Sequence, residues 1–156
     1  MQKHELFAEV DVLLGGRAAE EVFIGEISTG ASNDLERATD IIKAMISMYG
    51  MSEIAGLMVL EKQRNTFLTG GQTIKDYSDK MAEALDDYVK ATLDERYKGV
   101  VATLEIYKGA IETMVEALYE EETIEGAKVR EIIKEFEDKN KLVSRLQEED
   151  KKKEEK

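Results

Sequence analysis

The chain has 156 residues, a length that suits one domain with a real hydrophobic core and hardly two. Its formal net charge of −12 argues against general binding to nucleic acids or anionic membranes, because both polyanions would repel it. Cysteine is absent, which excludes disulfides and thiolate metal sites. No apolar run approaches the roughly 20 residues of a membrane-spanning helix, so the segment itself is expected to be soluble.

The first predicted helix covers residues 2–24, where apolar side chains recur at helical spacing. Gly15 and Gly16 interrupt this pattern, and each costs up to about 1 kcal/mol against alanine in a helix interior. We therefore expect close backbone contact with a neighbouring helix at these glycines, or a local bend. Residues 25–31 are predicted to form a turn. The apolar positions of the helix are Leu6, Val10, Leu13, Leu14, Ala18, Val22 and Phe23.

A second helix is predicted from Asn33 to Tyr49, with one apolar stripe. Ser32 or Asn33 is expected to cap it, and with Asn33 as N-cap the side chain of Glu36 falls at the capping-box position. Gly50 is the expected C-terminal stop. The stripe contains Leu35, Ala38, Ile42, Met45 and Tyr49.

The middle of the chain contains the only plausible strand, residues 56–60, and then a polar stretch, residues 63–73, that is predicted to be an exposed loop. A long helical region begins near Asp76 or Ser78. It is either one helix or two helices with a bend near Gly99 or Gly109.

Thr123 is expected to cap a last short helix whose apolar residues, ending with Phe136, face inward. The apolar signal then fades, so the folded unit is predicted to cover residues 1–140, and residues 141–156 a charged, disordered tail. The expected fold class is a mainly α, compact helical domain with at most one short strand.

Asp34 is the carboxylate of greatest interest, because it falls in the first turn of the second predicted helix. Acidic residues are favoured there, since they offset unpaired N–H groups and the helix dipole by about 0.3–1 kcal/mol. That structural role is the more common one on spacing alone. A side chain at a helix start is also held stiffly enough to serve as a ligand.

The only histidine is His4, and His4-Glu5 begins like the zinc-protease helix motif His-Glu-x-x-His. The fifth position is Ala8, so the second imidazole is missing. Zinc strongly favours nitrogen or sulfur donors, and one imidazole with scattered carboxylates does not make a tight site. We interpret His4 as an ordinary residue on an exposed helix face.

Two interpretations stay open for the neighbouring pair Glu20 and Glu21. Both are either solvated helix charges, or one of them lies behind a metal ligand and accepts its second imidazole N–H. Arg17 is spaced to pair with either glutamate, or with neither.

The order of these motifs resembles the peptidase domain of FtsH, the ATP-dependent zinc metalloprotease. The resemblance covers about residues 2–138, nearly all of the predicted folded part. Its longest run is Leu13 to Gly50, which includes Gly15-Gly16-Arg17-Ala18-Ala19-Glu20-Glu21 and Ser28-Thr29-Gly30-Ala31-Ser32-Asn33-Asp34. Further matching segments are Met51-Ser52-Glu53, Phe67-Leu68, Tyr77-Ser78 and Glu122-Thr123-Ile124-Glu125-Gly126.

This resemblance implies a membrane-anchored, hexameric AAA+ protease of protein quality control, with its peptidase domain on the cytoplasmic side. An ATPase module that uses ATP and Mg²⁺ unfolds protein substrates and threads them into a zinc peptidase ring. Two histidines of a His-Glu-x-x-His helix and one aspartate hold the zinc, and the glutamate between the histidines is the general base.

Of these residues only the aspartate is carried over, onto Asp34, and Glu20 matches a glutamate near the site to which we assign a supporting role. The catalytic helix, the ATPase module and the membrane segments would lie N-terminal to Met1. We therefore expect the isolated chain to be inactive, and to expose an apolar surface near Gly15 and Gly16 where the missing helix packs. The alternative is a non-catalytic acidic helical interaction module from a split or degenerate gene.

Overall fold

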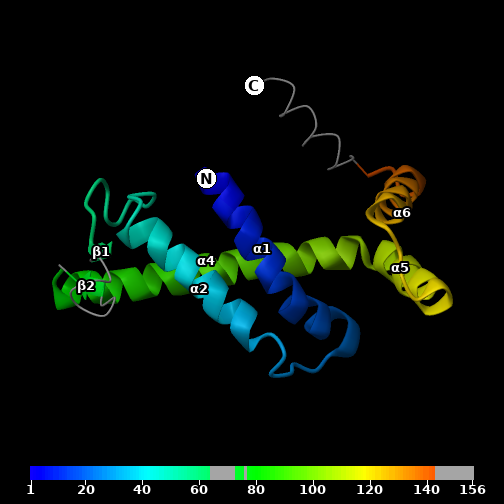
Figure 1. Cartoon of the computed structure of the whole chain (residues 1–156), viewed down its shortest axis with the longest axis horizontal. Helices are drawn as coiled ribbons and strands as arrows, with labels where there is room; N and C mark the ends of the chain where they lie inside the picture. The colour runs from blue at the N-terminus through cyan, green and yellow to red at the C-terminus, as the bar shows by residue number, and fades with distance from the viewer. Residues whose placement is uncertain (64–72, 76, 143–156) are drawn as a thin grey trace, which may run out of the picture. The chain divides into compact units, whose positions relative to one another are not determined.

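The computed structural model describes residues 1–63, 73–75 and 77–142, which form a mainly helical protein (Figure 1). The chain divides into two compact units, residues 1–102 and 103–156. Within the described ranges, no helix combines the length and the apolar content needed to cross a bilayer. The mainly α fold class predicted from the sequence is confirmed.

The first unit is built on α1 (Lys3–Ala19) and α2 (Ser32–Ser47), which pack against each other, and on the long helix α4 (Asp79–Ile106). The three helices share one buried core, because each carries an apolar stripe at helical spacing. The predicted inward positions of α1 and α2 are therefore largely confirmed. The buried residues of the core are Leu6, Val10, Leu13, Leu14, Ala38, Ile42, Met45, Ile46, Ala55, Leu60, Leu85 and Val89.

The first predicted helix has an additional feature at its C-terminal end. α1 stops at Ala19 and continues as a π-helical turn, η1 (Glu20–Ile24), which ends at Gly25 with a left-handed φ of 77°. Val22 and Phe23, predicted to face inward, are only partly buried, because the wider turn changes the direction in which side chains leave the axis.

α2 begins within one residue of the predicted position, but the predicted cap is wrong. The N-cap residue is Ala31, and no side chain caps the helix, so neither Ser32 nor Asn33 has that role. Both residues already belong to the helix, whose start follows a backbone turn in which the Ser32 N–H donates to the Thr29 carbonyl at 3.1 Å. Gly50 does follow the helix end, with a left-handed φ of 61°.

The predicted strand at residues 56–60 is also wrong. Gly56 has a left-handed φ of 55°, and the next residue, Leu57, is 98% exposed. Instead, two short antiparallel strands follow, β1 (Glu61–Gln63) and β2 (Thr73–Lys75), one more than predicted. Most of the predicted loop between them, with the Phe67-Leu68 segment, lies outside the described residues.

Polar contacts at α4 and just before it hold this helix to the rest of its unit. The Tyr77 hydroxyl, just before the helix, donates to Glu61 Oε1 at 2.9 Å, and burial first and this bond second raise the pKa of Tyr77 to about 12. Arg96 binds both carboxylate oxygens of Asp11, with 2.8 Å between Nε and Oδ1. The Arg96 guanidinium also lies 5.1 Å from the ring centre of Phe7.

The second unit contains α5 (Lys108–Glu121) and α6 (Gly126–Lys139), which pack against each other. The helical pattern is interrupted at Tyr107, so of the two alternatives left open by the sequence the region forms two helices and not one. Thr123 does not cap the last helix, because Glu125 is the N-cap residue and Glu122 ends the preceding helix with a left-handed φ of 61°. The predicted tail lies outside the described residues from 143 onward.

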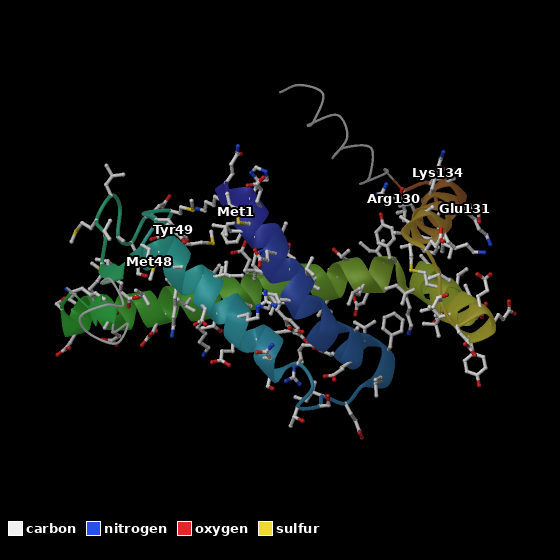
Figure 2. The ribbon with its side chains drawn as sticks, viewed as in Figure 1. Met1, Met48, Tyr49, Arg130, Glu131 and Lys134 are labelled. Carbon is white, nitrogen blue, oxygen red and sulfur yellow. The ribbon has the colours of Figure 1, made fainter. Side chains whose placement is uncertain are left out.

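The side chains in Figure 2 mark two contrasting surfaces. Met1 and Tyr49, at the start of α1 and just beyond the end of α2, are 76% and 58% exposed. On α6 the labelled side chains of Arg130, Glu131 and Lys134 are all exposed and charged.

Candidate metal centre

Asp34 is the third residue of α2, in the first helical turn, as the sequence predicts. Its side chain is half-buried. A short side chain at this place has few rotamers and a fixed backbone, so its carboxylate is held in a narrow range of positions. This is the geometry that a single metal ligand requires, and it is also that of an ordinary acidic helix start.

The face of α2 that carries Asp34 borders α1. Residues three and four positions apart share a helix face, so Arg37 and Ala38 lie on the same side as Asp34. Arg37 Nη2 is 3.8 Å from Glu9 Oε1 on α1, and Ala38 is fully buried. Asp34 is therefore on the face of α2 that borders α1.

The neighbouring face of α1 is uncovered. Val12 and Gly16 follow Glu9 by three and seven residues and so continue the same face toward the helix end. Val12 is 79% exposed, and a Cβ built on Gly15 or Gly16 would meet no atom within 4 Å among the described residues. The predicted close contact at these glycines is thus absent from the described part of the chain. What remains beside Asp34 is a smooth strip of small and apolar residues.

Glu20, the predicted supporting residue, bonds to the turn before α2. The Ser28 amide donates to Glu20 Oε2 at 3.1 Å, and the Ser28 hydroxyl donates to Oε1. Arg17 Nη1 lies 3.7 Å from Oε2, so the predicted pairing of Arg17 falls on Glu20. The Ser28 hydroxyl is the largest cause that lowers the pKa of Glu20 below its usual 4.5, and the Ser28 amide comes next.

Sequence reasoning missed Ser28. The distance of eight positions between Ser28 and Glu20 matches no regular spacing, because it depends on the π-helical turn and on the left-handed Gly25. A serine in a glycine-containing turn is the only signal that the sequence offers, and it is a common one.

Glu21 has a different partner. It accepts a hydrogen bond from the Tyr97 hydroxyl of α4. Burial and then this bond raise the pKa of Tyr97 from 10.0 to about 12. A groove of about 500 Å³ opens beside this pair, with Leu14, Leu35 and Leu93 in its wall. Glu21 is thus a contact between helices, and not a group free to act in chemistry.

The described residues do not form a complete metal site. They contain no group of three or more histidine, cysteine, aspartate or glutamate side chains placed to hold a metal. His4 is exposed in the first turn of α1, as predicted. A zinc site usually needs four ligands, more than any cluster of these side chains among the described residues supplies.

Comparison with known proteins places this geometry in a family. The sequence profile of peptidase family M41 matches residues 1–132. A Helicobacter felis protein named ATP-dependent zinc metalloprotease FtsH is 64% identical over 147 residues, which cover 94% of this chain and 23% of that protein. Proteins of the same name from a Sulfurovum species and from Thermotoga maritima are 59% and 36% identical, over 96% and 86% of this chain and 22% of each relative.

The chain therefore spans less than a quarter of the length of these relatives, and their names describe proteases. The residues that match the family include α1 and α2, and with them Asp34 at the start of α2. The chain belongs to peptidase family M41.

Proposed function

We propose that this chain is the C-terminal part of the peptidase domain of an ATP-dependent zinc metalloendopeptidase, in which Asp34 is a zinc ligand. The observation that carries the proposal is a half-buried carboxylate, fixed in the first turn of α2, in a chain that belongs to a family of zinc proteases. The zinc in such proteases activates a water molecule that attacks the peptide carbonyl.

The two histidine ligands and the general base come from a segment outside this sequence, whose only histidine is the exposed His4. We propose that this segment, a His-Glu-x-x-His helix, docks on the uncovered strip of Val12, Gly15 and Gly16. Residues without bulky side chains let a second helix come close, and Asp34 lies on the adjoining face of α2. Docking would bring the histidines to the Asp34 carboxylate.

In this arrangement the residues of the chain bind and orient. α1 and α2 fix the position of the Asp34 carboxylate, and a negatively charged oxygen at that place contributes one ligand and neutralises part of the metal charge. Without the docked helix the chain has one zinc ligand of three and no general base. We therefore propose that the isolated chain neither holds zinc tightly nor cleaves peptides.

The role of the whole protein belongs to the same proposal. Relatives named as ATP-dependent proteases suggest that proteins are the substrates, and that a separate module uses ATP and Mg²⁺. We propose a membrane-anchored homo-hexamer that degrades unfolded or membrane proteins in quality control, with this domain on the cytoplasmic side. In such a chain residues 1–140 form part of the peptidase domain and residues 141–156 a tail.

One observation favours a second candidate, a non-catalytic helical interaction module. Large apolar side chains are exposed in both units, with Leu57 98% and Tyr119 91% exposed, and the net charge of −12 would keep such a module soluble. The coding sequence upstream of Met1 separates the two candidates. An in-frame His-Glu-x-x-His helix and ATPase module support the protease, and their absence supports the module.

The direct test uses a chimera in which this chain replaces the matching segment of the Helicobacter pylori protease, which is 64% identical to it. Asp34→Ala is expected to abolish zinc occupancy and casein degradation while ATP hydrolysis continues. Asp40→Ala, an exposed aspartate on the same helix, is the matched control and should change neither. Full zinc occupancy and normal proteolysis in Asp34→Ala would exclude Asp34 as a ligand.

A further inference from the structure

A chain of hydrogen bonds joins Glu20, the first residue of η1, to the turn that precedes α2. The Gly30 N–H donates to Ser28 Oγ at 3.1 Å, and the Ser28 hydroxyl and amide both donate to the Glu20 carboxylate. Bonds to a charged acceptor are about twice as strong as neutral ones, and successive bonds polarise each other. The turn of residues 25–31 is therefore tied to one carboxylate.

These bonds lie just before the N-terminus of α2, which no side chain caps. The N-cap of α2, Ala31, has no side chain that can accept from the first N–H groups of the helix. The backbone instead turns immediately after Gly30, with the Ser32 N–H on the Thr29 carbonyl at 3.1 Å and the Leu35 N–H on the Ala31 carbonyl at 3.0 Å. The backbone turn thus determines where α2 begins, and the hydrogen bonds from Ser28 to Glu20 hold that turn.

Gly30 lies close to both groups that form these bonds. A Cβ on Gly30 would lie 3.3 Å from Ser28 Oγ and 3.9 Å from Glu20 Oε1. Asp34 is four residues beyond Gly30 and within the same first turn of the helix. A displacement of the turn would therefore carry the Asp34 carboxylate with it.

We propose that Ser28 and Glu20 are positioning residues for Asp34, and that Ser28 holds the start of α2 in the place where the Asp34 carboxylate reaches the zinc. This inference rests on the proposed function, in which Asp34 is a ligand. The supporting role that it gives Glu20 differs from acceptance of an imidazole N–H: the two Glu20 oxygens accept from the Ser28 amide and hydroxyl, with Arg17 beside Oε2.

The first experiment uses this 156-residue chain and needs no metal. Ser28→Ala removes the acceptor for the Gly30 amide, so hydrogen exchange at Gly30, followed by NMR, is expected to speed up at least tenfold. Ser28→Thr keeps a hydroxyl and should preserve the slow exchange. Ser32→Ala, an exposed serine in the first turn of α2, is the matched control. Equal exchange in Ser28→Ala and Ser32→Ala would show that the bonds are not made.

The second experiment measures zinc affinity by competition with a chelator, in the Helicobacter pylori chimera described above. Supporting groups behind a ligand typically change metal affinity about 10- to 100-fold, and we expect a loss in that range for Ser28→Ala and Glu20→Gln. Ser28→Thr should restore the affinity and Ser32→Ala should keep it. Thermal melts confirm that each variant is folded.

The outcomes separate the two proposals. Zinc affinity in Ser28→Ala equal to that of Ser32→Ala, or no recovery in Ser28→Thr, overturns the positioning role while leaving Asp34 as a ligand. Full zinc affinity in Asp34→Ala overturns the proposed function itself, whatever Ser28→Ala does.

Discussion

Gly109→Ala is expected to destabilise the second unit, although alanine is the better helix former. Gly109 is the second residue of α5, and the ring of Phe136 on α6 lies directly against it. A Cβ on Gly109 would be 2.8 Å from Phe136 Cε2, whereas carbon atoms attract each other best at about 3.5–4.0 Å. The overlap is therefore roughly 1 Å, and either the ring or the helix must move.

The magnitude depends on how freely the Phe136 ring moves. The ring lies near Tyr107, with 5.8 Å between the ring centres, and it lines a groove of about 360 Å³ together with Thr113. Overpacking costs about 1–3 kcal/mol, and a ring that can turn toward open space falls near the lower end. Alanine in a helix regains up to about 1 kcal/mol over glycine, so the net loss should be roughly 0–2 kcal/mol.

Gly99→Ala is the matched control, because Gly99 lies within α4 and a Cβ there would meet nothing within 4 Å. It should gain about 0.5–1 kcal/mol. The diagnostic quantity is the difference between the two variants in the free energy of unfolding by urea, which should be at least about 1 kcal/mol. Adding Phe136→Leu to Gly109→Ala should recover part of it. Equal stabilities for the two alanine variants would refute the steric argument.

Three further predictions concern the first unit. Ile42→Ala removes a side chain that is 1% exposed and should cost about 2–5 kcal/mol in urea denaturation; a loss below about 1 kcal/mol would contradict its place in the core. Because the pKa of Tyr97 is raised to about 12, the folded state favours the neutral phenol, a contribution that is present below pH 10 and is lost toward pH 12. The free energy of unfolding should therefore fall more steeply between pH 10 and pH 12 in the wild type than in Tyr97→Phe. Parallel pH dependences in the two proteins would show that Tyr97 is not held neutral by burial and the bond to Glu21. Arg96→Lys keeps the charge but loses the bidentate bond to Asp11, so the free energy of unfolding should fall by about 1 kcal/mol in thermal melts. Unchanged stability would show that the bidentate geometry does not contribute.

The sequence predicts best what a regular repeat encodes. Inward residues such as Val10 and Ile42 recur every three or four positions, and a stripe of that kind has one way to be buried. The helix ends were predicted less well. Ser32 and Asn33 are good capping residues, yet the backbone turn before them places both inside the helix, and Ala31 becomes the N-cap. The capping preference of these two residues was thus outweighed by the geometry of the preceding turn.

The strands and the partner of Glu20 escaped prediction for a related reason. β1 and β2 are three residues each and exist through pairing with each other, which no local pattern in residues 56–60 could reveal. The contact between Glu20 and Ser28 likewise depends on a π-helical turn and a left-handed glycine. Asp34, by contrast, was placed correctly, because a carboxylate in a first helical turn is a feature of a few consecutive residues.

The contacts that fix Asp34 indicate how the proposed zinc site would assemble. The position of Asp34 depends on contacts that lie wholly within the chain: the α1–α2 core below it, the Arg37–Glu9 pair beside it, and the Ser28–Glu20 bonds before it. None of these contacts requires a metal or a docked helix. Under the proposed function, the ordering entropy of Asp34 is therefore already spent before the histidine-bearing helix docks, so binding energy from the histidines is not needed to order this carboxylate. A site of this kind should assemble by docking of one preformed surface on another, and not by folding of the chain around zinc.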